Sequence, residues 1–136
     1  MITYVDASVL LRVIQGAPGS LEAWPDLSPV ASELVRVECL RVIDRARLSH
    51  SVDDPTSSEH RASVLTTLRS FALAPITSSI LDRAADPLPT ALGTLDAIHL
   101  ATALQLRDEY PELIFATHDR ELAIAARSMG FEVEGA

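Results

Sequence analysis

Residues 1–14 read MITYVDASVLLRVI, and this segment indicates the fold most clearly. Residues 2–5 form an apolar run of β-branched and aromatic side chains, which predicts a buried strand. The run stops at Asp6, and residues 8–14 are too apolar for a turn, so a helix is expected directly after the strand. A buried strand that passes straight into a helix is typical of a βα unit.

Strands and helices are expected to alternate along the rest of the chain. Further strands are expected at residues 29–31, 73–76, 113–116 and 131–133. Further helices are expected at residues 33–47, 61–71, 78–85, 95–109 and 120–129, with a polar loop at 49–59. The helix at 95–109 is apolar nearly all round, which predicts that it is buried between other elements. The pattern predicts an α/β fold whose central parallel sheet is flanked by helices.

Length and composition narrow the class of protein. The chain has 136 residues, so we expect one domain over residues 1–136. Hydrophobic residues make up 48% and charged residues 22%, which is ordinary for a globular domain. The net charge is −8 and every basic residue is an arginine, so bulk charge alone does not favour nucleic-acid binding. Any nucleic-acid chemistry therefore needs another source of positive charge.

Two further absences in the sequence guide the interpretation. Cys39 is the single cysteine, which excludes an internal disulfide framework and a cysteine-based zinc cage. No apolar run is long enough to span a membrane, and no signal peptide is recognisable at the first residues. We therefore expect a protein of a reducing compartment, the cytoplasm, with no membrane contact.

The predicted helix at 33–47 has a clear apolar stripe, with Ser32 as its expected N-cap. At 100° per residue, Cys39 falls in this stripe, which predicts a small core residue rather than a nucleophile. Glu38 lies at the border of the stripe, and Arg41 and Arg45 follow on its side of the helix.

Four acids lie where strands end or helices begin, which is where parallel sheets form their sites. Each of the four has a simpler structural interpretation. That interpretation is weakest for Asp6, because burying a carboxylate at the end of an apolar strand is costly unless other groups compensate for the lost water. Asp119 could be an ordinary helix N-cap, Asp96 could complement a helix dipole, and Glu38 could pair with Arg41. If the four carboxylates converge, their repulsion favours a hard divalent cation such as Mg²⁺ or Mn²⁺.

Other acidic α/β designs do not match the sequence. An aspartate-nucleophile phosphatase needs Asp-x-Asp after its first strand, where this chain has Asp6-Ala7-Ser8. A receiver domain needs a lysine, and a nucleotide-binding loop needs a glycine-rich motif; the sequence has neither.

Four motifs in order resemble those of PIN-domain ribonucleases, in particular the VapC toxins of bacterial toxin–antitoxin pairs. They are YVDASVLL at residues 4–11, ASELVRVE at 31–38, LDAIHLATA at 95–103 and ATHDREL at 116–122. The resemblance implies a PIN-like three-layer sandwich and Mg²⁺- or Mn²⁺-dependent endonucleolytic cleavage of RNA. It also implies a small cognate antitoxin of the VapB type and frequent homodimers.

The resemblance places the catalytic and metal-binding acids at Asp6, Glu38, Asp96 and Asp119. Ser8 and Thr117 match supporting hydroxyl residues that order the first acid or a metal-bound water. The role of proton acceptor stays open between Glu38 and Asp96, as does the number of metal ions.

Several alternatives remain open at this point. Arg12, Arg41 and Arg45 either hold the RNA backbone or only neutralise nearby acids. His99 and His118 are expected to be a packing histidine and a turn residue rather than metal ligands. A PIN-like module that binds RNA or an antitoxin without turnover is the main rival function, and a DNA-acting nuclease of the same fold is the third.

Overall fold

The computed structural model describes residues 1–21 and 24–136 and contains a five-stranded parallel sheet. The strands are β1 (Ile2–Val5), β2 (Ser28–Ser32), β3 (Ala72–Ala74), β4 (Ile114–Ala116) and β5 (Val133–Glu134). They are ordered β3-β2-β1-β4-β5, so β1 is central, with Tyr4 opposite Val30 on one side and Phe115 on the other. The parallel α/β architecture predicted from the sequence is confirmed.

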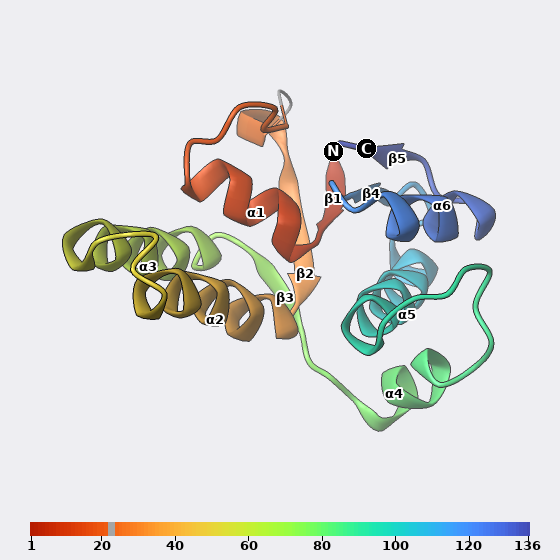
Figure 1. Ribbon diagram of the computed structural model, residues 1–136. Helices are drawn as coiled ribbons and strands as arrows, with labels where there is room; N and C mark the ends of the chain where they lie inside the picture. Colours follow the sequence, from red (N-terminus) through yellow and green to blue (C-terminus); the bar gives the residue numbers. More distant parts are fainter. Residues whose placement is uncertain (22–23) are drawn as a thin grey trace.

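Helices cover both faces of the sheet, which makes a three-layer sandwich (Figure 1). The helices are α1 (Ala7–Ile14), α2 (Leu34–Leu48), α3 (Asp54–Leu68), α4 (Ser78–Ala84), α5 (Thr94–Glu109) and α6 (Arg120–Ser128). A short 3-10 turn, η1 (Trp24–Asp26), precedes β2. Helices α1, α2 and α3 pack together on one side, and α4, α5 and α6 lie on the other (Figure 1).

The core is divided by the sheet, because successive strand residues point to opposite faces. Val5 packs with α1 and α2 residues such as Val9 and Val35, whereas Tyr4 packs with α5 and α6 residues such as Leu100 and Leu122. The middle of α5 is buried on every side over residues 97–103, as its sequence predicts. Because side chains pack against helices on both faces of the sheet, the carboxyl ends of β1 and β4 are held in place at one edge.

The predicted loop at residues 49–59 is wrong in its second half, because α3 begins at Asp54. The Asp53 side chain accepts a hydrogen bond from the Thr56 N–H at 2.7 Å and so caps the helix. Pro55 lies in the first turn, where its missing N–H has no intrahelical partner to lose. The Asp-Asp-Pro stretch therefore starts a helix instead of ending a loop.

The cap of α2 differs from the predicted one. Ser32 is the last residue of β2 and Glu33 takes the N-cap position, although the Ser32 hydroxyl still accepts from the Leu34 N–H at 3.1 Å. Gly93 is the N-cap of α5, and Thr94 is already helical. Within the described residues, no helix combines the length and apolarity needed to cross a bilayer.

Candidate active site

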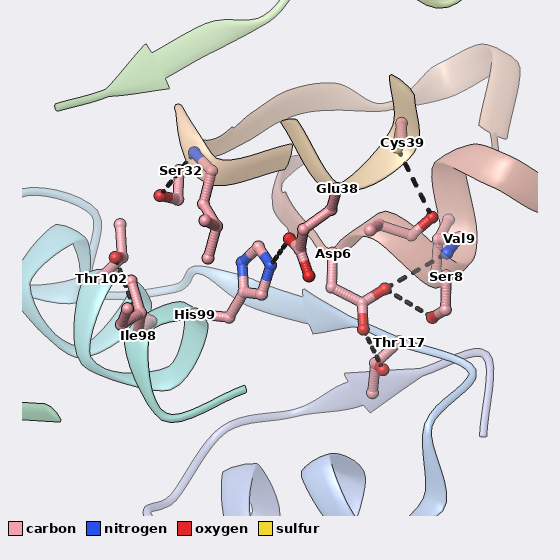
Figure 2. A network of polar contacts seen from close by, with 12 residues as sticks. Asp6, Ser8, Val9, Ser32, Glu38, Cys39, Ile98, His99, Thr102 and Thr117 are labelled. Atoms are coloured by element: carbon pink, nitrogen blue, oxygen red, sulfur yellow. Dashed lines mark hydrogen bonds and ion pairs between the residues drawn. The ribbon is translucent and has the colours of Figure 1, made fainter. Parts of the chain in front are cut away.

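Asp6 joins β1 to α1 and is 3% exposed. Its Oδ1 accepts from the Ser8 hydroxyl at 2.6 Å and from the Val9 N–H at 3.2 Å. Its Oδ2 accepts from the Thr117 hydroxyl at 2.5 Å, and Figure 2 shows the carboxylate enclosed by these groups. A carboxylate has about four lone-pair positions, so three donors leave room for one further partner.

The same hydroxyls connect the first acid to the last. The Ser8 hydroxyl accepts from the His118 N–H at 2.9 Å, and the Thr117 hydroxyl accepts from the Asp119 N–H at 3.0 Å. Asp119 caps α6, where its Oδ1 accepts from the Leu122 N–H at 2.8 Å. The N-cap interpretation of Asp119 is thus confirmed, and its second oxygen takes no part in the cap.

The end of β5 supports the loop that carries these groups. The Thr117 N–H donates to the Glu134 carbonyl at 3.0 Å, and Nδ1 of His118 lies 2.6 Å from the Gly135 carbonyl. Gly135 has φ +93°, and a Cβ there would lie 2.8 Å from the Thr117 carbonyl oxygen. His118 is therefore a turn residue, as predicted, but its contact with the C-terminal segment left no signal in the sequence.

Glu38 is held by a histidine rather than by an arginine. Nε2 of His99 lies 2.5 Å from Oε1 of Glu38, and Nδ1 of His99 lies 2.6 Å from the Tyr4 hydroxyl (Figure 2). The predicted pairing of Glu38 with Arg41 is wrong, because Arg41 lies 3.5 Å from Asp44 instead. His99 is a satisfied, buried histidine as expected, but sequence reasoning missed that its partner is Glu38, 61 residues away.

Asp96 lies in the first turn of α5 and is half-buried. Burial raises its pKa most, and the charge of Asp119 raises it next. His99 opposes these effects, while the charges of Asp6 and Glu38 add to them. The four predicted acids therefore share one electrostatic environment at the carboxyl edge of the sheet.

This set of side chains fits a hard divalent cation in its donor chemistry, since every donor is a carboxylate oxygen. Among the described residues, however, no three His, Cys, Asp or Glu side chains stand close enough together to hold an ion jointly as they are. Mg²⁺ commonly binds through one or two carboxylates and keeps several of its waters, so three direct contacts are not required.

The remaining predicted residues lie around this edge. Cys39 is fully buried, and burial followed by the charges of Glu38 and Asp6 raises the pKa of its thiol to about 12, so it is a core residue as predicted. Arg12 is partly buried at the end of α1, with its guanidinium beside Gly19. Arg41 and Arg45 are exposed on α2.

A PIN domain family model matches residues 3–128 of the chain. This chain belongs to the PIN domain family. The chain is 32% identical over 136 residues to the protein named Ribonuclease VapC47 from Mycobacterium tuberculosis (strain CDC 1551 / Oshkosh). The match covers 94% of this chain and 92% of that protein. It is therefore a VapC relative within the family.

Two solved structures share the PIN fold with this chain. One is described as a toxin–antitoxin complex from Klebsiella pneumoniae, with 24% identity, a TM-score of 0.62, and coverage of 90% of this chain and 91% of that one. The other is VapBC2 from Rickettsia felis bound to a DNA fragment from its promoter, with 12% identity, a TM-score of 0.67, and coverage of 98% of both chains. At these identities the likeness concerns the fold.

Proposed function

We propose that this PIN domain is a metal-dependent endoribonuclease that hydrolyses phosphodiester bonds in RNA. The observation that carries the proposal is the network in which the Ser8 and Thr117 hydroxyls hold the buried Asp6 carboxylate next to the loop of Asp119. Asp96 and Glu38 interact electrostatically with the same site. The 32% identity to a protein named as a ribonuclease supports the same reaction. The proposal also answers the charge problem of a chain with net charge −8, because a cation would supply positive charge locally.

In this proposal Asp6, Glu38, Asp96 and Asp119 would hold Mg²⁺ or Mn²⁺, one or two of them directly and the others through its waters. When bound, such an ion stabilises charge on phosphate oxygens and lowers the pKa of a coordinated water. Ser8 and Thr117 would fix the direction of Asp6, to which both donate. Arg12, Arg41 and Arg45 are proposed to contact the RNA backbone, since guanidinium groups bind phosphate oxygens in pairs.

The test is cleavage of an RNA oligonucleotide by the full chain, with Mg²⁺ or Mn²⁺ and with EDTA. Asp6→Asn and Asp96→Asn should each reduce cleavage roughly 100-fold or more, since charge stabilisation by a metal ion is worth several kcal/mol. Asp82→Asn is the matched control, because Asp82 is exposed on α4. Unchanged cleavage in both site variants, with the fold intact by circular dichroism, would mean that the site is wrong.

The same assay separates the rival functions. A DNA oligonucleotide of matched sequence competes with the RNA if the enzyme is a DNA nuclease. Binding of RNA without any product at any metal concentration would favour a module that works without turnover.

We also propose a small antitoxin of the VapB type as the protein partner, and homodimers as the state of the free protein. The similar structure described as a toxin–antitoxin complex and the one named VapBC2 support the first. On α2, the exposed Val37 and Leu48 share one face with the ion pair of Arg41 and Asp44, which suits a partner surface of mixed apolar and charged character. Co-expression with the product of a small neighbouring reading frame should give a complex that no longer cleaves RNA, and light scattering reads the oligomeric state.

The cytoplasm is the proposed place of action. Cys39 is free and buried, which suits a reducing compartment. Fractionation of the cells that make the protein is the direct measurement.

A further inference from the structure

A buried polar chain runs from the core to the candidate active site. It starts at Tyr4 on β1, which is 0% exposed, and passes through His99 on α5, which is 1% exposed. It ends at Glu38 on α2, with distances of 2.6 Å and 2.5 Å between the bonded atoms (Figure 2). These contacts therefore link α5 to α2, which cover opposite faces of the sheet (Figure 1).

We propose that Tyr4 and His99 are positioning residues for Glu38: the His99 ring stands between the Tyr4 hydroxyl and the Glu38 carboxylate, and its Nε2–H donates to that carboxylate. An ionised carboxylate can only accept, so Nε2 must carry a hydrogen. A phenol can donate to Nδ1 or accept from it, so the Tyr4 hydroxyl holds the ring in either case. The proposal rests on the proposed function, in which Glu38 is a site acid.

The packing around Tyr4 makes the hydrogen-bonded row of Tyr4, His99 and Glu38 a rigid support. The Tyr4 ring stacks on Phe115 with centroids 5.2 Å apart and meets His99 edge-on at 5.8 Å. Tyr4 and Phe115 lie opposite each other on the neighbouring strands β1 and β4. The direction of the Tyr4 hydroxyl is thus set by the core and not by solvent.

The support decides where the charge of Glu38 stands. Glu38 has three rotatable bonds, and Arg41 one turn away is an alternative partner on the exposed face. In the structure the carboxylate turns inward instead, and it influences both Asp96 and Cys39 electrostatically. The hydrogen bond from His99 thus keeps Glu38 among the acids of the site rather than at the outer face of α2.

The first test reads the histidine directly and does not involve RNA. Long-range proton–nitrogen spectra of the ¹⁵N-labelled full chain at neutral pH report which ring nitrogen carries the hydrogen. We expect a hydrogen on Nε2 of His99, and Tyr4→Phe should shift the Nδ1 resonance, because it removes the partner of that nitrogen. A ring with its hydrogen on Nδ1 alone, or an Nδ1 resonance that does not move in Tyr4→Phe, would overturn the proposal.

The second test measures kinetics on RNA with saturating metal. Tyr4→Phe should lower kcat about 10- to 100-fold, as for other groups that orient a ligand of a metal, with KM for RNA within about twofold. His99→Leu should lose more, and His99→Gln should recover part of the loss, because its amide N–H can still donate to Glu38. Tyr110→Phe is the matched control, since the second tyrosine of the chain lies at the far end of α5.

A structural role and a positioning role are separated by the Glu38→Gln background. There, Tyr4→Phe should cause no further loss of kcat, because the carboxylate that it orients is already gone. An equal loss in both backgrounds would mean that Tyr4 acts on the fold and not through Glu38. Melting curves check each variant, and the spectra of the unmodified protein decide the matter even where a variant fails to fold.

The outcomes also separate this inference from the proposed function. If Asp6→Asn and Asp96→Asn leave cleavage unchanged, the proposed function fails, while the histidine spectra still read the polar chain. If both abolish cleavage and Tyr4→Phe behaves like Tyr110→Phe, the inference fails alone.

Discussion

Asp6 is a buried acid whose surroundings replace the water that it loses. Burying a charged group costs several kcal/mol unless donors compensate, and Asp6 has the hydroxyls of Ser8 and Thr117 and the Val9 N–H. The sequence places Ser8 next to Asp6, because it is two residues away. The contribution of Thr117, 111 residues away, needs the pairing of β1 with β4.

Removal of the Thr117 hydroxyl tests this support at the scale of one residue. Thr117→Val keeps the side-chain shape, but it removes the donor to Asp6 and the acceptor for the Asp119 N–H. RNA cleavage should fall about 10- to 100-fold, measured as kcat/KM at fixed metal concentration. Thr3→Val is the control, because Thr3 is buried in β1 and donates to the Met1 carbonyl instead; an equal fall in this control would indicate a general effect on the strand.

Cys39 offers a prediction that is independent of catalysis. Burial, and then the charges of Glu38 and Asp6, raise the pKa of the thiol to about 12, whereas an unfolded cysteine has a pKa near 8.5. The unfolded state thus loses its thiol proton first, and this group lowers stability as the pH rises from about 8.5 towards 12. At pH 8.5 iodoacetamide should label the native protein far more slowly than the protein in guanidinium, since only the thiolate reacts. Equal rates by mass spectrometry would contradict the burial.

At the scale of elements, local sequence signals locate most helices and misplace some of their ends. Asp119 caps α6 as its sequence suggests, because an Asp before an apolar helix can accept from the third N–H. The polar stretch before α3 is misleading, since Asp53 and Pro55 are both frequent in loops and in first turns. Polar composition alone does not distinguish these two environments.

Asp119 has a structural role and a proposed catalytic role, and one substitution separates them. Asn is as good an N-cap as Asp, so Asp119→Asn should leave the melting temperature within about 2 °C of the parent value. The same variant should lose RNA cleavage, because an amide does not supply the negative charge that a cation needs. Cleavage that survives Asp119→Asn would limit Asp119 to its cap, while Asp119→Ala should lower stability in either case.

At the scale of the whole molecule, the site stores repulsion between acids from distant segments. The folded pKa of Asp96 lies above its unfolded value, through burial and the neighbouring charges, so the unfolded state loses this proton at lower pH. The ionised carboxylate therefore destabilises the native state at neutral pH. The effect is modest, because Asp96 is only half-buried and solvent screens it.

Two changes in melting temperature follow from this repulsion, one without metal and one with it. Without metal, in EDTA, Asp96→Asn should melt slightly higher than the parent protein, since a repelled charge is removed. With saturating Mn²⁺, the parent protein should melt higher than in EDTA, because a ligand that binds only the folded state stabilises it. The variant should lose most of this gain in melting temperature, as measured by calorimetry. An equal gain in both proteins would exclude Asp96 from the metal site.

The alternation of strands and helices, the parallel sheet and the buried α5 are encoded in the amino-acid sequence, which also predicts a site of four acids at the carboxyl edge. These features follow from apolar periodicity, capping and the order of motifs, which are local along the chain. The tertiary structure alone decided that Glu38 turns to His99 rather than Arg41, and that Thr117 and the end of β5 support the last acid. Such contacts join residues that only the sheet brings together, and side-chain partners across a sheet depend on packing and register that local sequence does not encode.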